Sequence, residues 1–289
     1  MRSIRFHIVV VLALLVAGAW PARAQQLSDK LTDILKEAQK AETAGLPVRV
    51  VELYQKAMAQ GIQDKGQLRQ VFLLRAFAYE RVYELPKAES DYTSAIKITP
   101  VDPKAFAERG YFYLRRGRYA DALDDFVAGS RLAPGNPLFQ YAAGRSLAAL
   151  KSDQGAAELY SEAIKLNPGD SKYYLSRAEA YLRMKKFREA AADYDQAIRL
   201  KLTAGREWFF AYLGRGYARL ALNNYDVAVE DLTEALKQQP NDFQALTWRG
   251  FAYERKGDRD LALIDYERAL KFDPDNKWLR GSIQRLRSS

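Results

Sequence analysis

The chain has 289 residues, of which 48% are hydrophobic and 28% charged, so it has ample apolar material for an extensive core. It contains no cysteine, which excludes disulfides, thiolate metal sites and cysteine nucleophiles. The formal net charge of +9 favours anionic partners.

Residues 1–24 are typical of a secretory signal peptide of bacterial style. Arg2 and Arg5 precede an apolar run from residue 8 to residue 19, and Ala22-Arg23-Ala24 places small residues where a signal peptidase cuts. We therefore expect cleavage before Gln25 and a periplasmic or secreted location. The run is shorter than the roughly 20 residues that span a bilayer, although an uncleaved anchor is the alternative. Cleavage would also remove His7, the single histidine, and lower the formal charge to +6, because the segment carries three arginines and no acid.

A 34-residue period organises the rest of the chain. Thr99-Pro100, Ala133-Pro134 and Asn167-Pro168 follow one another at this spacing, which also separates Gln239-Pro240 from Asp273-Pro274. Repeats of this length indicate a solenoid, in which each repeat stacks on its neighbours. The frame predicts a leader at 25–30, insertions at 65–68 and 205–208, a last helix at 277–289, and seven repeats at 31–64, 69–102, 103–136, 137–170, 171–204, 209–242 and 243–276.

Particular residue types recur at fixed positions, numbered from the first residue of each repeat. Position 8 is always alanine or glycine, position 20 is alanine in six repeats, and position 24 is aromatic in six. Small side chains at positions 8 and 20 let two helices approach closely, and the aromatic ring fills the space beside them. Apolar residues recur three or four apart, which is helical spacing. Helix ends are marked by proline near position 32 and by Gly45, Gly117, Asn223 and Gly257 near position 15.

These patterns resemble the tetratricopeptide-repeat (TPR) family. Gly250-Phe251-Ala252-Tyr253, followed by Ala262, Tyr266, Ala269 and Pro274, matches the family pattern, and the resemblance extends over residues 31–276. It implies an all-α fold, a right-handed superhelical solenoid of helix-turn-helix units with a C-terminal capping helix.

Three departures from the family pattern stand out. The first repeat lacks a terminal proline and has Pro47 in its turn, and Leu202 replaces proline in the fifth repeat. Arg219 replaces the aromatic residue at position 11 of the sixth repeat, so we expect looser packing there.

The last segment has one apolar face, formed by Trp278, Leu279, Ile283 and Leu286. We expect it to cover the open end of the seventh repeat and to expose its charged residues.

Positions 7 and 23 change together among the repeats. Five repeats have arginine at position 7 and aspartate at position 23, whereas the first has Glu37 with Leu53 and the fourth has Ala143 with Leu159. We infer that the two positions touch, because the planar guanidinium binds a carboxylate through two parallel bonds. The alternative is that both face solvent. The predicted pairs are Arg75–Asp91, Arg109–Asp125, Arg177–Asp193, Arg215–Asp231 and Arg249–Asp265.

The TPR resemblance also implies a concave groove, lined by the first helices through positions 2, 5, 9, 12 and 13. Aromatic residues and arginines recur there, with Glu179 at position 9 of the fifth repeat. Such side chains are the usual energetic anchors of interfaces. Alternatively, some of the rings pack against neighbouring repeats. The expected partner-binding residues are Phe77, Arg81, Tyr111, Arg115, Tyr141, Arg145, Arg183, Tyr217, Phe251 and Arg255.

The sequence favours a protein-interaction scaffold of the bacterial cell envelope over an enzyme. No phosphate loop, zinc motif or serine-nucleophile motif appears, and we expect no catalytic residues, cofactor or metal. The expected partner is another envelope protein that offers an acidic segment. An acidic polysaccharide bound in the same groove is the alternative. Nucleic acid is not expected, because export takes the chain away from it, and the oligomeric state is left open.

Overall fold

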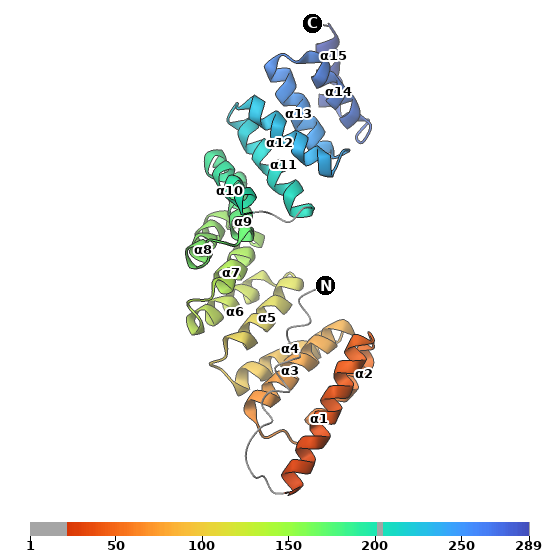
Figure 1. The fold of residues 1–289 in the computed structure, drawn as a ribbon, viewed down its shortest axis with the longest axis vertical. Helices are drawn as coiled ribbons and strands as arrows, with labels where there is room; N and C mark the ends of the chain where they lie inside the picture. The colour runs from red at the N-terminus through yellow and green to blue at the C-terminus, as the bar shows by residue number, and fades with distance from the viewer. Residues whose placement is uncertain (1–21, 201–204, 289) are drawn as a thin grey trace. The chain divides into compact units, whose positions relative to one another are not determined.

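The computed structural model describes residues 22–200 and 205–288, and every regular element in these ranges is a helix (Figure 1). The all-α class is therefore confirmed. The described chain begins at Ala22, so residues 1–21 of the predicted signal peptide lie outside it, as does Leu202. None of the described helices is long and apolar enough to cross a membrane.

The chain forms two compact parts, a first part up to Pro134 and a second part from Gly135. The described helices of the first part are α1 (Ala22–Thr43), α2 (Pro47–Met58), α3 (Lys65–Arg81), α4 (Leu85–Ile98), α5 (Pro103–Arg115) and α6 (Tyr119–Leu132). Those of the second part are α7 (Pro137–Ala149), α8 (Asp153–Leu166), α9 (Ser171–Arg183), α10 (Phe187–Arg199), α11 (Arg206–Ala221), α12 (Tyr225–Gln238), α13 (Phe243–Lys256), α14 (Arg259–Leu270) and α15 (Lys277–Ser288).

Within each part, every predicted repeat is a pair of packed helices joined by a short turn. Helix α3 packs against α4, α9 against α10 and α13 against α14. Within a part, the first helix of a repeat also packs against the second helix of the preceding repeat, as α3 does against α2, α9 against α8 and α13 against α12. This stacking is the predicted solenoid arrangement.

The two four-residue insertions lengthen first helices. Helix α3 has 17 residues and α11 has 16, whereas α5, α7 and α9 have 13 each. Four residues add about one turn of α-helix. The insertions therefore extend the helix and leave its packed face unchanged.

The turn within each repeat places a left-handed residue at position 15. The predicted helix ends at glycine and asparagine are confirmed, since Gly117, for example, has φ of 72° and Asn223 has φ of 62°. Three bulkier residues adopt the same conformation, Tyr83 at 61°, Lys151 at 63° and Lys185 at 58°. A left-handed backbone costs such residues roughly 1–2 kcal/mol, so the helix-pair geometry sets the turn even where the sequence opposes it.

Five first helices (α3, α5, α7, α9 and α13) begin at side-chain caps, which stand at position 34 of the preceding repeat, whereas α11 begins at Gly205 without one. Asp102, Asp170 and Asp242 each accept a hydrogen bond from a backbone N–H in the first turn of the next helix. Asn276 caps α15 in the same way, accepting from the N–H of Leu279 at 3.0 Å. These bonds satisfy backbone N–H groups of the first turn, which have no acceptor within the helix.

Small residues at position 8 are required by the ring at position 24. A Cβ added to Gly144 would lie 2.6 Å from the ring of Tyr160, and one added to Gly250 would lie 2.7 Å from the ring of Tyr266. Both distances are shorter than a normal contact. The predicted complementarity of the two positions is confirmed.

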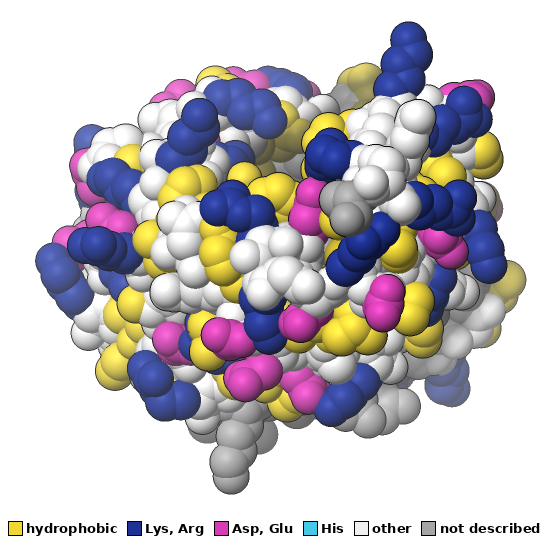
Figure 2. Space-filling model, turned by 90° about the horizontal axis from the view of Figure 1, so that it is seen from above, with side chains coloured by type: hydrophobic (Ala, Val, Ile, Leu, Met, Phe, Trp, Pro, Cys, Tyr) yellow, Lys and Arg dark blue, Asp and Glu magenta, His cyan; other side chains and the backbone are white. Residues whose placement is uncertain are grey.

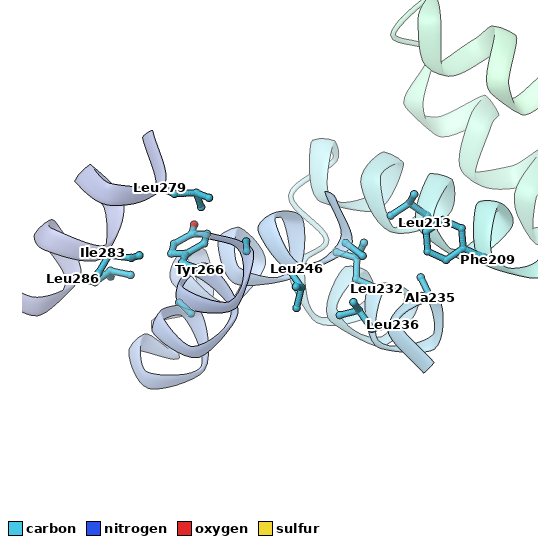
Figure 3. Close-up of a cluster of buried hydrophobic side chains, with 13 residues drawn as sticks. Phe209, Leu213, Leu232, Ala235, Leu236, Leu246, Tyr266, Leu279, Ile283 and Leu286 are labelled. Carbon is cyan, nitrogen blue, oxygen red and sulfur yellow. The ribbon is translucent and has the colours of Figure 1, made fainter. Parts of the chain in front are cut away.

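Helix α15 covers the apolar side of the seventh repeat (Figure 3). Leu279, Ile283 and Leu286 point towards Tyr266 and are buried. On the other side of the helix, Gln284 is exposed at the position that holds a small residue in the repeats. The helix therefore resembles the first half of a repeat whose outer face is polar, as expected of a cap.

All five predicted arginine–aspartate pairs are present, and each is bidentate. In the seventh repeat, Nε and Nη2 of Arg249 donate to the two carboxylate oxygens of Asp265 at 2.7 and 2.8 Å. The five carboxylates are buried. Burial raises the pKa of Asp193, and the bonds from Arg177 oppose this rise. The two parallel bonds from a guanidinium lead us to assign the ionised pair at neutral pH.

Three of these arginines also link consecutive repeats through a hydroxyl, which the sequence did not suggest. The remaining guanidinium nitrogen donates to a hydroxyl at position 25 of the preceding repeat. These bonds join Arg109 to Thr93 at 3.1 Å, Arg177 to Ser161 at 2.9 Å and Arg249 to Thr233 at 3.0 Å.

For the arginine of the sixth repeat, the acceptor at position 25 of the preceding repeat is a carboxylate, Asp195, in place of a hydroxyl. Arg215 donates to Asp195 at 2.6 Å as well as to Asp231. Arg219 bonds the same two aspartates at 3.1 and 3.0 Å. Arg219 thus completes a network of two arginines and two aspartates, and looser packing at this position stays a prediction.

Candidate partner-binding groove

Acidic neighbours balance the two predicted arginines of the first part. Arg115 on α5 donates to both carboxylate oxygens of buried Glu80, at 3.1 and 2.6 Å. The hydroxyl of Tyr92 donates to Glu80 as well, at 2.8 Å. Burial raises the pKa of Glu42, and the positive charge of nearby Arg81 opposes this rise. The guanidinium of Arg115 is thus bound to Glu80, and the charge of Arg81 lies near the carboxylate of Glu42.

These contacts follow a rule that the sequence reasoning missed. A glutamate at position 12 faces an arginine of the next first helix. Glu254 on α13 follows the same rule, because it accepts from Arg285 of α15 at 2.8 Å. The signal was present in the sequence, where Glu42, Glu80 and Glu254 all occupy position 12.

The second part lacks this compensation at two of its predicted arginines. Position 12 of the sixth repeat, which would face Arg255, is Leu220, and Arg145 stands at position 9 of its own repeat and not at position 13. Among the described residues, no carboxylate forms an ion pair with Arg145 or Arg255, and both side chains are exposed. Arg145 lies 5.9 Å from the ring centre of Tyr141, and Arg255 lies over aromatic rings in the same way. These two guanidinium groups remain available to an anionic partner.

Arg183, the third predicted arginine of the second part, has a partner from the preceding repeat. Its Nε donates to Asp153 at 2.6 Å, although its side chain is still 40% exposed. It therefore contributes less net charge to the groove than Arg145 and Arg255 do.

The predicted aromatic residues are half-buried and contact other rings. Tyr217 stacks on Trp248 with ring centres 4.6 Å apart. Phe251 lies 6.5 Å from Trp278, and Tyr111 meets the ring of Phe126 edge-on at 5.1 Å. Tyr141 contacts the rings of Tyr160 and Tyr173, and Phe77 is half-buried on α3.

A hollow of about 300 Å³ opens between α7, α8 and α9 in the second part. It brings together two predicted residues, Arg145 and Arg183, with Glu179 and with the ring of Tyr160. The full lining is Arg145, Ala148, Ala149, Lys151, Tyr160, Ser176, Glu179 and Arg183.

On the one face that Figure 2 shows, basic side chains lie scattered among acidic and apolar ones. Nucleic-acid-binding surfaces usually concentrate their positive charge along one face. In the described residues, no group of three or more His, Asp or Glu side chains could hold a metal ion. At the predicted groove positions of the second part, the described residues therefore offer guanidinium groups, aromatic rings and a hollow.

The chain belongs to the tetratricopeptide-repeat family. The sequence pattern of that family matches residues 78–137, 108–171 and 213–277, which together cover more than half of the chain, and a second pattern of the same name matches residues 171–203. The first and second repeats are the ones least covered by these matches.

Three similar proteins place the chain in context. Serine/threonine-protein phosphatase 5 of Mus musculus is 35% identical over 95 residues, which are 33% of this chain and 18% of the phosphatase. The C-terminal part of a TPR repeat-containing protein from Cytophaga hutchinsonii has a similar fold, with a TM-score of 0.68 and 16% identity over 86% of this chain and 98% of the other. YrrB, described as a TPR protein with an unusual peptide-binding site, has a TM-score of 0.60 and 16% identity over 67% of this chain and 97% of its own. The chain thus spans less than a fifth of the phosphatase, and the two structures show the fold alone.

Proposed function

We propose that this protein is an exported scaffold whose second part binds an acidic segment of a cell-envelope protein. Proteins built from TPR repeats generally mediate protein–protein interactions, and YrrB is described as having a peptide-binding site. The envelope location and the acidic character of the segment are our additions.

One observation carries the proposal. Arg145 and Arg255 are exposed on first helices, have no acidic partner among the described residues, and lie over aromatic rings. A guanidinium group held against a ring is oriented for a second, bidentate bond to a carboxylate. Aromatic and arginine side chains in such positions are typical anchors of an interface.

Crosslinking in intact cells tests this proposal. The protein is produced with its own leader, crosslinked, and its partners are identified for the parent and for the double variant Arg145→Glu/Arg255→Glu. The control is Arg188→Glu/Arg199→Glu, which makes the same charge change at exposed positions of the second helix α10. We expect a defined envelope protein to be captured by the parent and by the control and lost from the groove variant. Equal capture by all three would place the interface elsewhere.

The structure indicates which of the predicted arginines can be altered without damage to the fold. Reversing the charge of Arg115 would set a new carboxylate against buried Glu80 and would damage the fold directly. Arg145 and Arg255 have no such partner, so their reversal should affect binding alone.

We propose export on the basis of the residues that precede Gln25. The amino-terminal sequence of the protein recovered outside the cytoplasm should begin near Gln25. Recovery of the chain with its original amino terminus would contradict cleavage.

An acidic polysaccharide is the second candidate ligand of the groove. It is favoured by Trp278, which is 49% exposed beside Phe251 and could stack on a sugar ring. A polysaccharide ligand should remain bound after the extract is treated with protease, whereas a protein partner should be lost. We expect no catalytic activity in either case, since a TPR fold is typically a scaffold.

A further inference from the structure

The hollow over Tyr160 exists because two adjacent positions are unusually small. Positions 12 and 13 are Ala148 and Ala149 in the fourth repeat, whereas the second repeat has Glu80 and Arg81 there. Large side chains at these positions would fill the space above the ring. The fourth repeat alone therefore combines a position-24 tyrosine with two alanines at positions 12 and 13.

The floor of the hollow lacks the partner found in two other repeats. The hydroxyl of Tyr92 donates to Glu80 at 2.8 Å, and that of Tyr266 donates to Glu254 at 2.8 Å. The fourth repeat has Ala148 where those glutamates stand. The phenol of Tyr160 is thus free to donate to a carboxylate that comes from outside the chain.

The walls of the hollow carry opposite charges. Arg145 comes from α7 and Glu179 from α9, and among the described residues neither makes an ion pair. Glu179 is accessible to solvent but lies in a recess with protein around it. Burial in this recess raises the pKa of Glu179 above its usual value, and the charge of Arg183 opposes the rise.

We propose that this hollow binds one carboxylate side chain of the partner segment, and that Glu179 takes up a proton from solvent when it binds. The inference rests on the proposed function, because it takes the acidic segment as given. The incoming carboxylate accepts hydrogen bonds from the guanidinium of Arg145 and from the hydroxyl of Tyr160. Protonated Glu179 donates its O–H to the same carboxylate, so that one proton is held between two acidic groups.

The proton is needed because two carboxylates cannot both remain charged in so small a space. When two acidic groups share a site, each raises the pKa of the other, and one of them becomes protonated. Glu179 is the more readily protonated of the two, because burial already raises its pKa in the free protein. Burial and the charge of Glu179 raise the pKa of Tyr160, so its phenol stays protonated and remains a donor.

Several other groups around the hollow face Glu179. The positive charge of Arg183 favours ionised Glu179, and the phenols of Tyr160 and Tyr194 stay neutral because burial raises their pKa values. The charged and titratable groups that face Glu179 are Arg145 on α7, Lys151 in the turn after it, Tyr160 on α8, Arg183 on α9 and Tyr194 on α10.

The sign of the pH dependence follows from the two pKa values of Glu179. The pKa in the complex is higher than in the free protein, so the complex binds more protons between these two values. Over that range the affinity falls as the pH rises, by up to about tenfold per pH unit for one proton. Below the lower value and above the higher value the affinity is independent of this group.

Calorimetric titration measures the uptake directly. The probe is a blocked peptide of alternating glutamate and serine, and its glutamine counterpart is the control ligand. Titration in two buffers of different ionisation enthalpy gives the number of protons taken up, which we expect to approach about one for the parent within the sensitive pH range. In Glu179→Gln the uptake and the pH dependence should vanish, while the matched variant Glu189→Gln, at an exposed position of α10, should behave as the parent.

A second variant closes the hollow without disturbing the fold. Ala148→Glu gives Tyr160 the carboxylate partner that Tyr92 and Tyr266 have in their repeats. We expect it to fold as the parent does and to lower the affinity for the glutamate peptide by at least about tenfold, since it removes both the space and the free phenol.

The outcomes separate this inference from the proposed function. Glutamate-peptide binding without proton uptake, or with uptake that Glu179→Gln retains, would overturn the inference and leave the groove proposal standing. Unchanged binding by Ala148→Glu would also overturn it. Failure of the glutamate peptide to bind at any pH would count against both.

Discussion

Replacing Arg249 by alanine should cost far more stability than an exposed charge would. Asp265 is 1% exposed, and the arginine side chain that bonds it is 15% exposed. The variant Arg249→Ala leaves the aspartate buried without its partner, and it also removes the bond to Thr233. Breaking a buried pair in this way costs about 3–5 kcal/mol.

Replacing both members of the pair should cost less stability than replacing Arg249 alone, and the fourth repeat shows a natural example. The fourth repeat has Ala143 and Leu159 at the two positions, so this fold accepts an apolar pair there. In Arg249→Ala/Asp265→Leu no charge remains buried, and we expect a loss of about 1–2 kcal/mol. The coupling energy between the two positions is then about 2 kcal/mol or more.

Urea denaturation provides the measurement. The protein is produced without residues 1–24, which removes Trp20 and leaves Trp208, Trp248 and Trp278, all in the second part. Tryptophan fluorescence then follows the unfolding of the region that contains the pair, and circular dichroism follows all helices. The control is a cycle on Lys165 and Glu162, an exposed pair on α8, for which coupling below about 1 kcal/mol is expected. Additive effects of Arg249→Ala and Asp265→Leu would refute the reasoning.

Three further predictions concern the solenoid itself. Gly250→Ala should destabilise the protein by about 1–3 kcal/mol, because the new Cβ would stand 2.7 Å from the ring of Tyr266; Gly281→Ala, in an open helical position, should instead stabilise it by about 0.5–1 kcal/mol, and equal effects in thermal melts would contradict this account. Tyr83→Gly should raise the free energy of unfolding by roughly 1 kcal/mol, since the residue is 80% exposed and has φ of 61°. A lower stability of this variant in urea would show that the tyrosine ring makes a stabilising contact. Deleting residues 277–289 should expose the apolar end of the seventh repeat and cause aggregation, whereas a truncated chain that sediments as the parent does would exclude a capping role.

The repeat frame was predictable because it depends on residue types that recur at fixed spacing. In every repeat a small residue at position 8 indicates that two helices pack closely. The joint change of positions 7 and 23 identified a contact that the structure confirms. These are local rules that each repeat obeys by itself. A period in the sequence is therefore sufficient to reveal them.

Features that depend on a missing side chain were harder to predict. The hollow over Tyr160 requires Ala148 and Ala149 to be small together, and neither alanine stands out in an alanine-rich chain. The left-handed turn at Lys151 was missed for a related reason, because the packing of two helices imposes a conformation that lysine itself disfavours. The balance of Arg115 by Glu80 crosses from one repeat to the next and becomes visible only when neighbouring repeats are compared as pairs.

The bonds that Arg109, Arg177, Arg215 and Arg249 make to the preceding repeat determine which repeats are interchangeable. Arg177 and Arg249 each need only a hydroxyl from the preceding repeat. Their repeats should therefore be able to follow any repeat that has serine or threonine at position 25. The sixth repeat is different, because Arg219 relies on Asp195 of the fifth repeat as well as on its own aspartate. We therefore expect rearranged chains to keep the fifth and sixth repeats together, because separating them would break the bond between Arg219 and Asp195.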